Sequence, residues 1–216
     1  MMLVLLDLDN TLVDRDSAFA TWVHGLARDE GADEAAASRV LEVDDSGYGE
    51  RDDVAAAIRR EFGVTDDDET LLDRMRHEHV EHVELHDGVT RALEALAGRG
   101  VDIAVLTNGN VKQQTMKLEH VGLAHLVDGA VISESAGLEK PDPEIFRRAV
   151  EGRGASVDDA WMVGDNVDAD IRGAQEAGLR TGWVSLGRDW PGGAAPTVQA
   201  ASTAEVLARI ADTLEP

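Results

Sequence analysis

Short apolar runs alternate with amphipathic stretches over most of this chain, and that alternation strongly constrains its fold. Short strands that alternate with helices are typical of a doubly wound parallel sheet, in which helices cover both faces of buried strands. We therefore predict an α/β fold with a Rossmann-like core. The expected strands are 1–6, 101–106, 130–132, 160–163 and 181–184, and the expected core helices are 88–99, 111–120, 143–151, 167–177 and 203–214.

One long stretch interrupts the alternation. Residues 14–86 carry helical patterns only, in which apolar side chains recur at three- and four-residue spacing. We predict that 14–86 is an all-helical domain inserted after the first strand, and that 1–13 and 87–216 together form the core. Its expected helices are 16–30, 33–43, 51–62 and 67–83.

Composition limits the classes of partner. The 216 residues carry a net charge of −23, so the surface disfavours nucleic acid and anionic membranes. There is no cysteine, which excludes disulfides and thiolate zinc sites. Because the sequence has neither a basic leader nor a long apolar segment, we expect a cytoplasmic protein, monomeric or homodimeric.

Polar side chains follow the predicted strands at the points where they end. Parallel sheets bind ligands outside the carboxyl ends of their strands, so these side chains are expected to meet. Each alone has an ordinary alternative, such as a turn, a helix cap or a solvated charge. Together they predict one site, formed by Asp7, Asp9, Thr107, Asn108, Lys140, Asp165 and Asp170.

Asp7 and Asp9 directly follow the first strand. If extended geometry persists there, residues two apart point the same way and their carboxylates repel each other. A pair so placed is used for metal binding, proton transfer or nucleophilic attack. The alternative is that Asp7 ends the strand and Asp9 begins a turn.

Four segments resemble motifs of the haloacid dehalogenase superfamily, in the branch whose helical cap follows the first strand. They occur in the expected order and, with the insertion, account for nearly the whole chain. The segments are DLDNT at 7–11, TNG at 107–109, KPDPEIF at 140–146 and GDNVDADIRGA at 164–174.

The resemblance implies a role for each site residue. Asp7 would be the nucleophile and form an aspartyl-phosphate, while Asp9 would act first as general acid and then as general base. Thr107 and the backbone of Asn108 would bind the phosphoryl oxygens, and Lys140 would offset their charge.

The resemblance also implies Mg²⁺, which prefers oxygen ligands. The implied ligands are Asp7, the Asp9 main-chain carbonyl and Asp165. Asp170 would be either a further ligand or a group that orients a metal-bound water or Lys140.

The expected activity is that of a Mg²⁺-dependent phosphatase acting on a nucleoside monophosphate, a sugar phosphate, phosphoglycolate or a similar metabolite. One alternative is a 2-haloacid dehalogenase, but those members resemble this chain without the second aspartate, because a leaving halide needs no proton. A non-catalytic phosphate-binding or regulatory module is the other alternative, and the complete residue set argues against it. Family members with phosphonatase or β-phosphoglucomutase chemistry use a lysine of the inserted domain. Residues 14–86 contain no lysine, so these two chemistries are disfavoured.

The inserted domain is expected to select the substrate by closing over the site. In the loop 44–53, Tyr48 and Arg51 are candidate contacts, although Arg51 could instead pair with a neighbouring acid such as Glu50 or Asp53.

Two further features have no assigned role. His79, His82 and His86 would share one helical stripe, and with His77 they are interpreted as a solvated, pH-sensitive face rather than a metal site. Residues 187–193 are predicted to form a surface loop.

Overall fold

The computed structural model describes residues 2–214. The chain divides into two compact units, an α/β unit of Met1–Val13 with Leu85–Pro216 and a helical unit of Asp14–Glu84. The helical unit ends at Glu84, two residues before the end of the predicted insertion, 14–86. None of the described helices combines the length and the apolar character that crossing a membrane requires.

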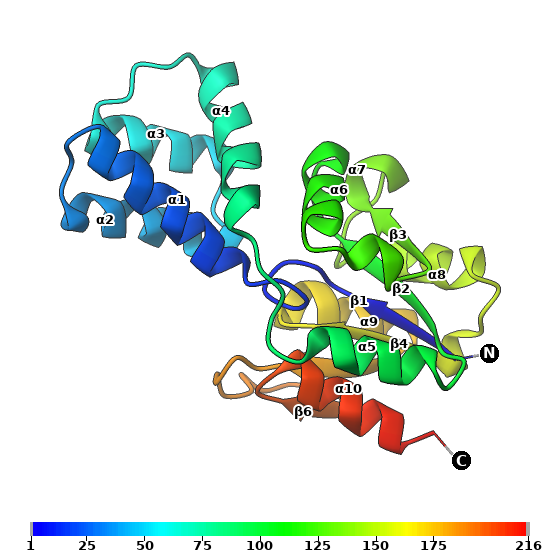
Figure 1. Cartoon of the computed structure of the whole chain (residues 1–216). Helices are drawn as coiled ribbons and strands as arrows, with labels where there is room; N and C mark the ends of the chain where they lie inside the picture. Colours follow the sequence, from blue (N-terminus) through cyan, green and yellow to red (C-terminus); the bar gives the residue numbers. More distant parts are fainter. Residues whose placement is uncertain (1, 215–216) are drawn as a thin grey trace. The chain divides into compact units, whose positions relative to one another are not determined.

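The α/β unit is built on one six-stranded, fully parallel sheet with the order β3-β2-β1-β4-β5-β6 (Figure 1). β1 lies between β2 and β4, so the order reverses direction there, at the topological switch point where such folds bind ligands. The strands are β1 (Leu3–Leu6), β2 (Asp102–Thr107), β3 (Gly129–Ile132), β4 (Ala160–Gly164), β5 (Arg180–Val184) and β6 (Val198–Ala200).

Helices cover both faces of this sheet because β1 is apolar on both. Leu3 and Leu5 pack with residues of α8 and α9, while Val4 and Leu6 point to the opposite face and are also fully buried. α10 lies against α5, β5 and β6. The helices are α5 (Val89–Ala97), α6 (Val111–His120), α7 (Ser133–Ala136), α8 (Pro143–Gly152), α9 (Gly173–Ala177) and α10 (Thr203–Asp212).

The helical unit has its own apolar core, which includes Phe19, Trp22, Val40, Ile58 and Leu71. Aspartates cap three of its four helices, because a carboxylate at the N-cap accepts from a backbone N–H that has no partner within the helix. The helices are α1 (Arg15–Asp29), α2 (Glu34–Asp44), α3 (Arg51–Phe62) and α4 (Asp68–His77), and the capping residues are Asp14, Asp33 and Asp67.

The structure corrects several predicted elements. β6 was not predicted, because its three residues form no apolar run. The expected helix 67–83 ends at His77 and continues as a 3₁₀ turn, Glu78–His82. The expected helix 167–177 begins with a π-helical segment, Val167–Arg172, before α9. α7 was also missed, since it has only four residues.

Candidate active site

The predicted carboxylates follow β1 and β4, which are neighbours in the sheet. The backbone N–H of Asp7 donates to the carbonyl of Val163, so Asp7 still pairs with the adjacent strand. The chain then turns sharply, with Asn10 in the left-handed region at a φ of 57°. Asp7 and Asp9 both precede this turn and have different partners although they are only two residues apart.

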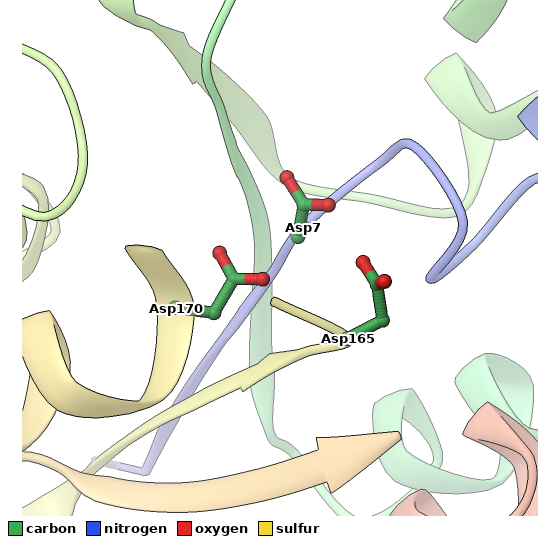
Figure 2. Close-up of side chains that lie close together, drawn as sticks. All are labelled: Asp7, Asp165 and Asp170. Carbon is green, nitrogen blue, oxygen red and sulfur yellow. The ribbon is translucent and has the colours of Figure 1, made fainter. Parts of the chain in front are cut away.

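Asp7, Asp165 and Asp170 converge, with one carboxylate oxygen of each within 4.8 Å of the others (Figure 2). All three are buried. Gly164 makes room for this arrangement, because a Cβ at that position would lie 2.1 Å from Asp170 Oδ2. The Asn166 backbone N–H donates to the same oxygen at 3.0 Å.

Lys140 is the cation of this cluster. Its ammonium donates to Asp7 Oδ1 and to Asp170 Oδ1, each at 2.6 Å, and the side chain is almost fully buried. Asn108 fixes the lysine's backbone, since its side-chain amide donates to the Lys140 carbonyl at 2.8 Å and accepts from the Lys140 N–H at 2.9 Å.

Burial dominates the electrostatics of the cluster. It raises the pKa of Asp7 to about 7, because the attraction of Lys140 does not offset desolvation and the charge of Asp170 adds to it. Burial likewise raises the pKa of Asp165 to about 6 and that of Asp170 above its usual value. Burial alone would lower the pKa of Lys140, but the charges of Asp170 and Asp7 outweigh it and raise this pKa.

The donor set fits a hard divalent cation. Lys140 pairs with Asp7 and Asp170, and Arg188 pairs with Asp165, so three carboxylates face two cations and offer only oxygen ligands, as Mg²⁺ prefers. The raised pKa values of Asp7 and Asp165 agree with this, since burial raises both and the neighbouring carboxylates add to the effect.

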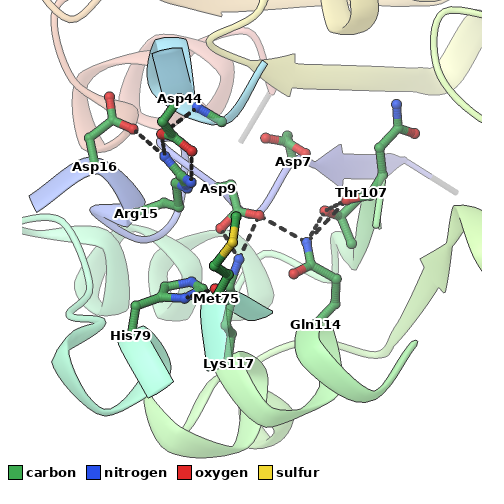
Figure 3. Close-up of polar contacts among 12 residues, drawn as sticks. Asp7, Asp9, Arg15, Asp16, Asp44, Met75, His79, Thr107, Gln114 and Lys117 are labelled. Carbon is green, nitrogen blue, oxygen red and sulfur yellow. Dashed lines mark hydrogen bonds and ion pairs between the residues drawn. The ribbon is translucent and has the colours of Figure 1, made fainter. Parts of the chain in front are cut away.

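Asp9 and Thr107 lie beside this cluster in the same unit (Figure 3). Two residues that were not predicted contact them: Lys117 binds Asp9, and Gln114 links Asp9 to Thr107. Lys117 donates to both carboxylate oxygens of Asp9, at 2.6 and 2.8 Å. The Gln114 side-chain amide donates to Asp9 Oδ2 at 3.0 Å and to Thr107 Oγ1 at 2.7 Å. Both lie on α6, three residues apart, on the face that is buried in the structure.

The loop at 187–193 also contributes to the site. Arg188 donates to Asp165 Oδ2 at 3.0 Å and to the Asp165 carbonyl at 2.8 Å. The indole of Trp183 donates to the same carbonyl at 3.0 Å, and Trp190 packs edge-on against Trp183. The predicted loop therefore holds Asp165 in place, which its composition did not reveal.

The other predicted residues belong to the helical unit. Arg51 pairs with Asp44, an acidic residue seven positions earlier in the chain, at 3.2 Å. Asp44 is buried and forms a bidentate pair with buried Arg15 (Figure 3). Tyr48 is 49% exposed in the loop between these residues.

The interpretation of the histidines as one solvated stripe is wrong. His79 is buried, and its Nδ1 lies 2.9 Å from the carbonyl of Met75. His77 pairs with Asp73 on α4, whereas His82 ends the 3₁₀ turn and His86 lies beyond it. Because the helix ends at His77, the spacing of three and four residues no longer places them on one face.

Comparison with known proteins places this geometry in a family. A family model described as haloacid dehalogenase-like hydrolase matches residues 4–184. The crystal structure of the HAD-hydrolase YfnB from Bacillus subtilis, bound to magnesium, superposes with a TM-score of 0.82 at 26% identity and 98% coverage of each chain.

Curated relatives match over shorter segments. Phosphoserine phosphatase of Thermus thermophilus is 46% identical over 89 residues, which cover 41% of this chain and 36% of the relative. Pyrimidine 5'-nucleotidase YjjG of Escherichia coli is 38% identical over 121 residues, which cover 55% of this chain and 53% of the relative. The matches thus span about half or less of these relatives' length.

Proposed function

The chain belongs to the haloacid dehalogenase-like hydrolases, and we propose that it is a Mg²⁺-dependent phosphatase of a small phosphorylated metabolite. The observation that carries this proposal is the pair of lysine-bound carboxylates, Asp7 on Lys140 and Asp9 on Lys117, two residues apart just after β1. One carboxylate is suited to attack phosphorus and the other to move a proton.

The proposed first step is attack of an Asp7 carboxylate oxygen on phosphorus, with departure of the substrate alkoxide. Asp9 gives that alkoxide a proton, because an alkoxide is a poor leaving group. In the second step Asp9 takes a proton from the water that attacks the aspartyl-phosphate, and Asp7 is released. Asp7 thus forms and then loses the bond to phosphorus, while Asp9 gives a proton in the first step and takes one in the second.

The remaining residues stabilise charge. Thr107, with the backbone of Asn108, binds the phosphoryl oxygens, and Lys140 offsets the charge that develops between them and Asp7. Asp7, the Asp9 main-chain carbonyl, Asp165 and Asp170 would hold Mg²⁺, which when bound neutralises phosphoryl charge and orients the phosphate for in-line attack.

Asp9 is also what favours phosphoryl transfer over dehalogenation. Release of a halide needs no proton, so a dehalogenase has no use for a second carboxylate held by a buried lysine. The relatives named as a phosphoserine phosphatase and a pyrimidine nucleotidase support a phosphate monoester as the substrate.

We further propose that the helical unit, 14–86 in the sequence prediction, selects among such esters. The Arg15–Asp44 pair orders the start of the loop 44–53, since Asp44 also accepts from the Gly47 N–H at 3.0 Å. That loop carries Tyr48 and Arg51, the candidate contacts for the part of the metabolite beyond its phosphate. A nucleoside monophosphate, a sugar phosphate and phosphoglycolate remain the candidate classes.

Hydrolysis of p-nitrophenyl phosphate and of a metabolite panel, with and without Mg²⁺, tests the proposal. We expect turnover that is lost in EDTA and in Asp7→Asn. The matched control is Asp168→Asn, an exposed aspartate that pairs with Arg172 near the same site. Full activity of Asp7→Asn, or of the EDTA-treated protein, would refute the mechanism, and binding without turnover would favour a non-catalytic module.

A further inference from the structure

Lys117 is a buried charge that lies against the carboxylate of Asp9. The side chain is 2% exposed, and its ammonium lies within 2.8 Å of both Asp9 oxygens. Withdrawing the Lys117 ammonium from water is unfavourable, and its partner Asp9 keeps a side chain that is 28% exposed, so the pair is weak support for stability. A role in orienting Asp9 accounts for a lysine at this position better than stability does.

Gln114 extends the same contact to a second residue of the site. Its Nε2 lies 3.0 Å from Asp9 Oδ2 and 2.7 Å from Thr107 Oγ1, so one amide links the carboxylate to the hydroxyl. The side chain is buried, at 1% exposure. Gly109 accommodates it, because a Cβ there would lie 3.2 Å from the Gln114 side chain and the glycine has a φ of 141°.

The register of α6 is fixed at its start. Asn110 caps the helix, and its side chain accepts from the Gln113 N–H at 3.2 Å. Glu134 anchors the same turn, since it accepts from the Asn110 side chain at 2.8 Å and from the Val111 N–H at 2.7 Å. Gln114 and Lys117 therefore reach Asp9 from a rigid helix rather than from a mobile loop.

We propose that Lys117 and Gln114 are positioning residues, which hold the Asp9 carboxylate beside the Thr107 hydroxyl in the orientation that proton transfer requires. The inference rests on the proposed phosphatase function and adds to it two residues from α6. With Asp9 held there, its proton passes to the ester oxygen as the P–O bond breaks and the bond from Asp7 to phosphorus forms. Asp9 then recovers a proton from water as the new P–O bond forms and the bond to Asp7 breaks.

The leaving group separates this role from simple support of the fold. p-Nitrophenolate departs without a proton, so kcat/KM for p-nitrophenyl phosphate does not depend on the general acid. An alkyl phosphate such as glycerol phosphate does depend on it. For Lys117→Met we expect kcat/KM to fall at least tenfold more for the alkyl ester than for the aryl ester. The whole contribution of general acid–base catalysis, about 10²- to 10⁴-fold, sets the upper limit of this difference.

The second step gives an independent kinetic readout. Misplacing Asp9 slows attack of water on the aspartyl-phosphate, so p-nitrophenyl phosphate should give a burst of p-nitrophenolate in Lys117→Met. In steady state kcat and KM for this ester should fall together. Gln114→Leu should show the same pattern more weakly, and Lys117→Arg should keep more alkyl esterase activity than Lys117→Met.

Lys112→Met is the matched control, because it makes the same substitution at an exposed position of the same helix. It should leave both esters unchanged. A thermal-unfolding cycle tests the pairing without any activity. Lys117→Met should lower Tm in the wild-type background but not in Asp9→Asn, where Lys117 is already a buried cation without its counter-charge.

The outcomes separate the two proposals. Equal loss of both esters in Lys117→Met, with no burst, means that Lys117 only supports the fold; this overturns the positioning role and leaves the phosphatase standing. If the wild type hydrolyses no phosphate ester while the Tm cycle still shows coupling, the proposed function fails and the ion pair is structural. Additive Tm effects would overturn the pairing itself.

Discussion

Asp7→Asn should stabilise the metal-free protein at neutral pH, although it removes the proposed nucleophile. Burial raises the pKa of Asp7 from 3.8 to about 7. Between those values the folded protein retains a proton that the unfolded chain has released, so the free energy of unfolding falls as pH rises from about 4 to about 7. Asparagine has nearly the same shape and does not ionise, so the variant lacks this loss.

The size of the effect follows from linkage. One pKa unit corresponds to about 1.36 kcal/mol, and a carboxyl that titrates near pH 7 when folded should lose about 2 kcal/mol of stability between pH 5 and pH 7. For a chain of this length that is a relative Tm shift of about 4–8 °C. The lowered pKa values of Asp102, Glu61 and Asp67 have the opposite sign, and their stabilisation is lost only as pH falls below about 4.

Urea unfolding in EDTA at pH 5, 6 and 7 measures the difference directly. We expect Asp7→Asn to gain about 2 kcal/mol in free energy of unfolding over the wild type across that interval. Asp168→Asn should follow the wild type. Saturating Mg²⁺ should favour the wild type instead, because a ligand stabilises the state that binds it. Parallel pH profiles in EDTA for wild type and Asp7→Asn would refute the reasoning.

Two further substitutions test other contacts. Arg188→Met removes a donor to Asp165, so we expect Mg²⁺ affinity measured by calorimetry to fall about tenfold; unchanged affinity would mean that the loop does not orient this carboxylate. Arg15→Met leaves Asp44 buried without its bidentate partner and should lower the free energy of unfolding by about 3–5 kcal/mol. Arg39, whose half-exposed side chain pairs with Glu61, is the control. Arg39→Met should change the free energy of unfolding by less than about 1 kcal/mol. Equal losses in the two arginine variants would contradict this assignment.

The sequence predicted the sheet because its buried strands are continuous apolar runs, and it predicted the site residues because polar groups follow those runs. It missed β6, in which only Ala200 is buried. It also missed Lys117, because a lysine on an amphipathic helix normally belongs to the solvated face. Only the close approach of α6 to the turn after β1, a tertiary contact, makes this lysine a buried partner of Asp9.

Two of the three lysines in this acidic chain are buried on the aspartates of the first motif. Asp9 pairs with Lys117, a different lysine from the one bound to Asp7. Asp7 shares Lys140 with Asp170 and lies near Asp165, so that cluster keeps an excess of negative charge. In the proposed mechanism this excess charge attracts the divalent cation to the Asp7 cluster. We therefore propose that the two lysines separate the two roles: Asp7, beside Lys140, acts next to the metal, and Asp9, beside Lys117, exchanges protons.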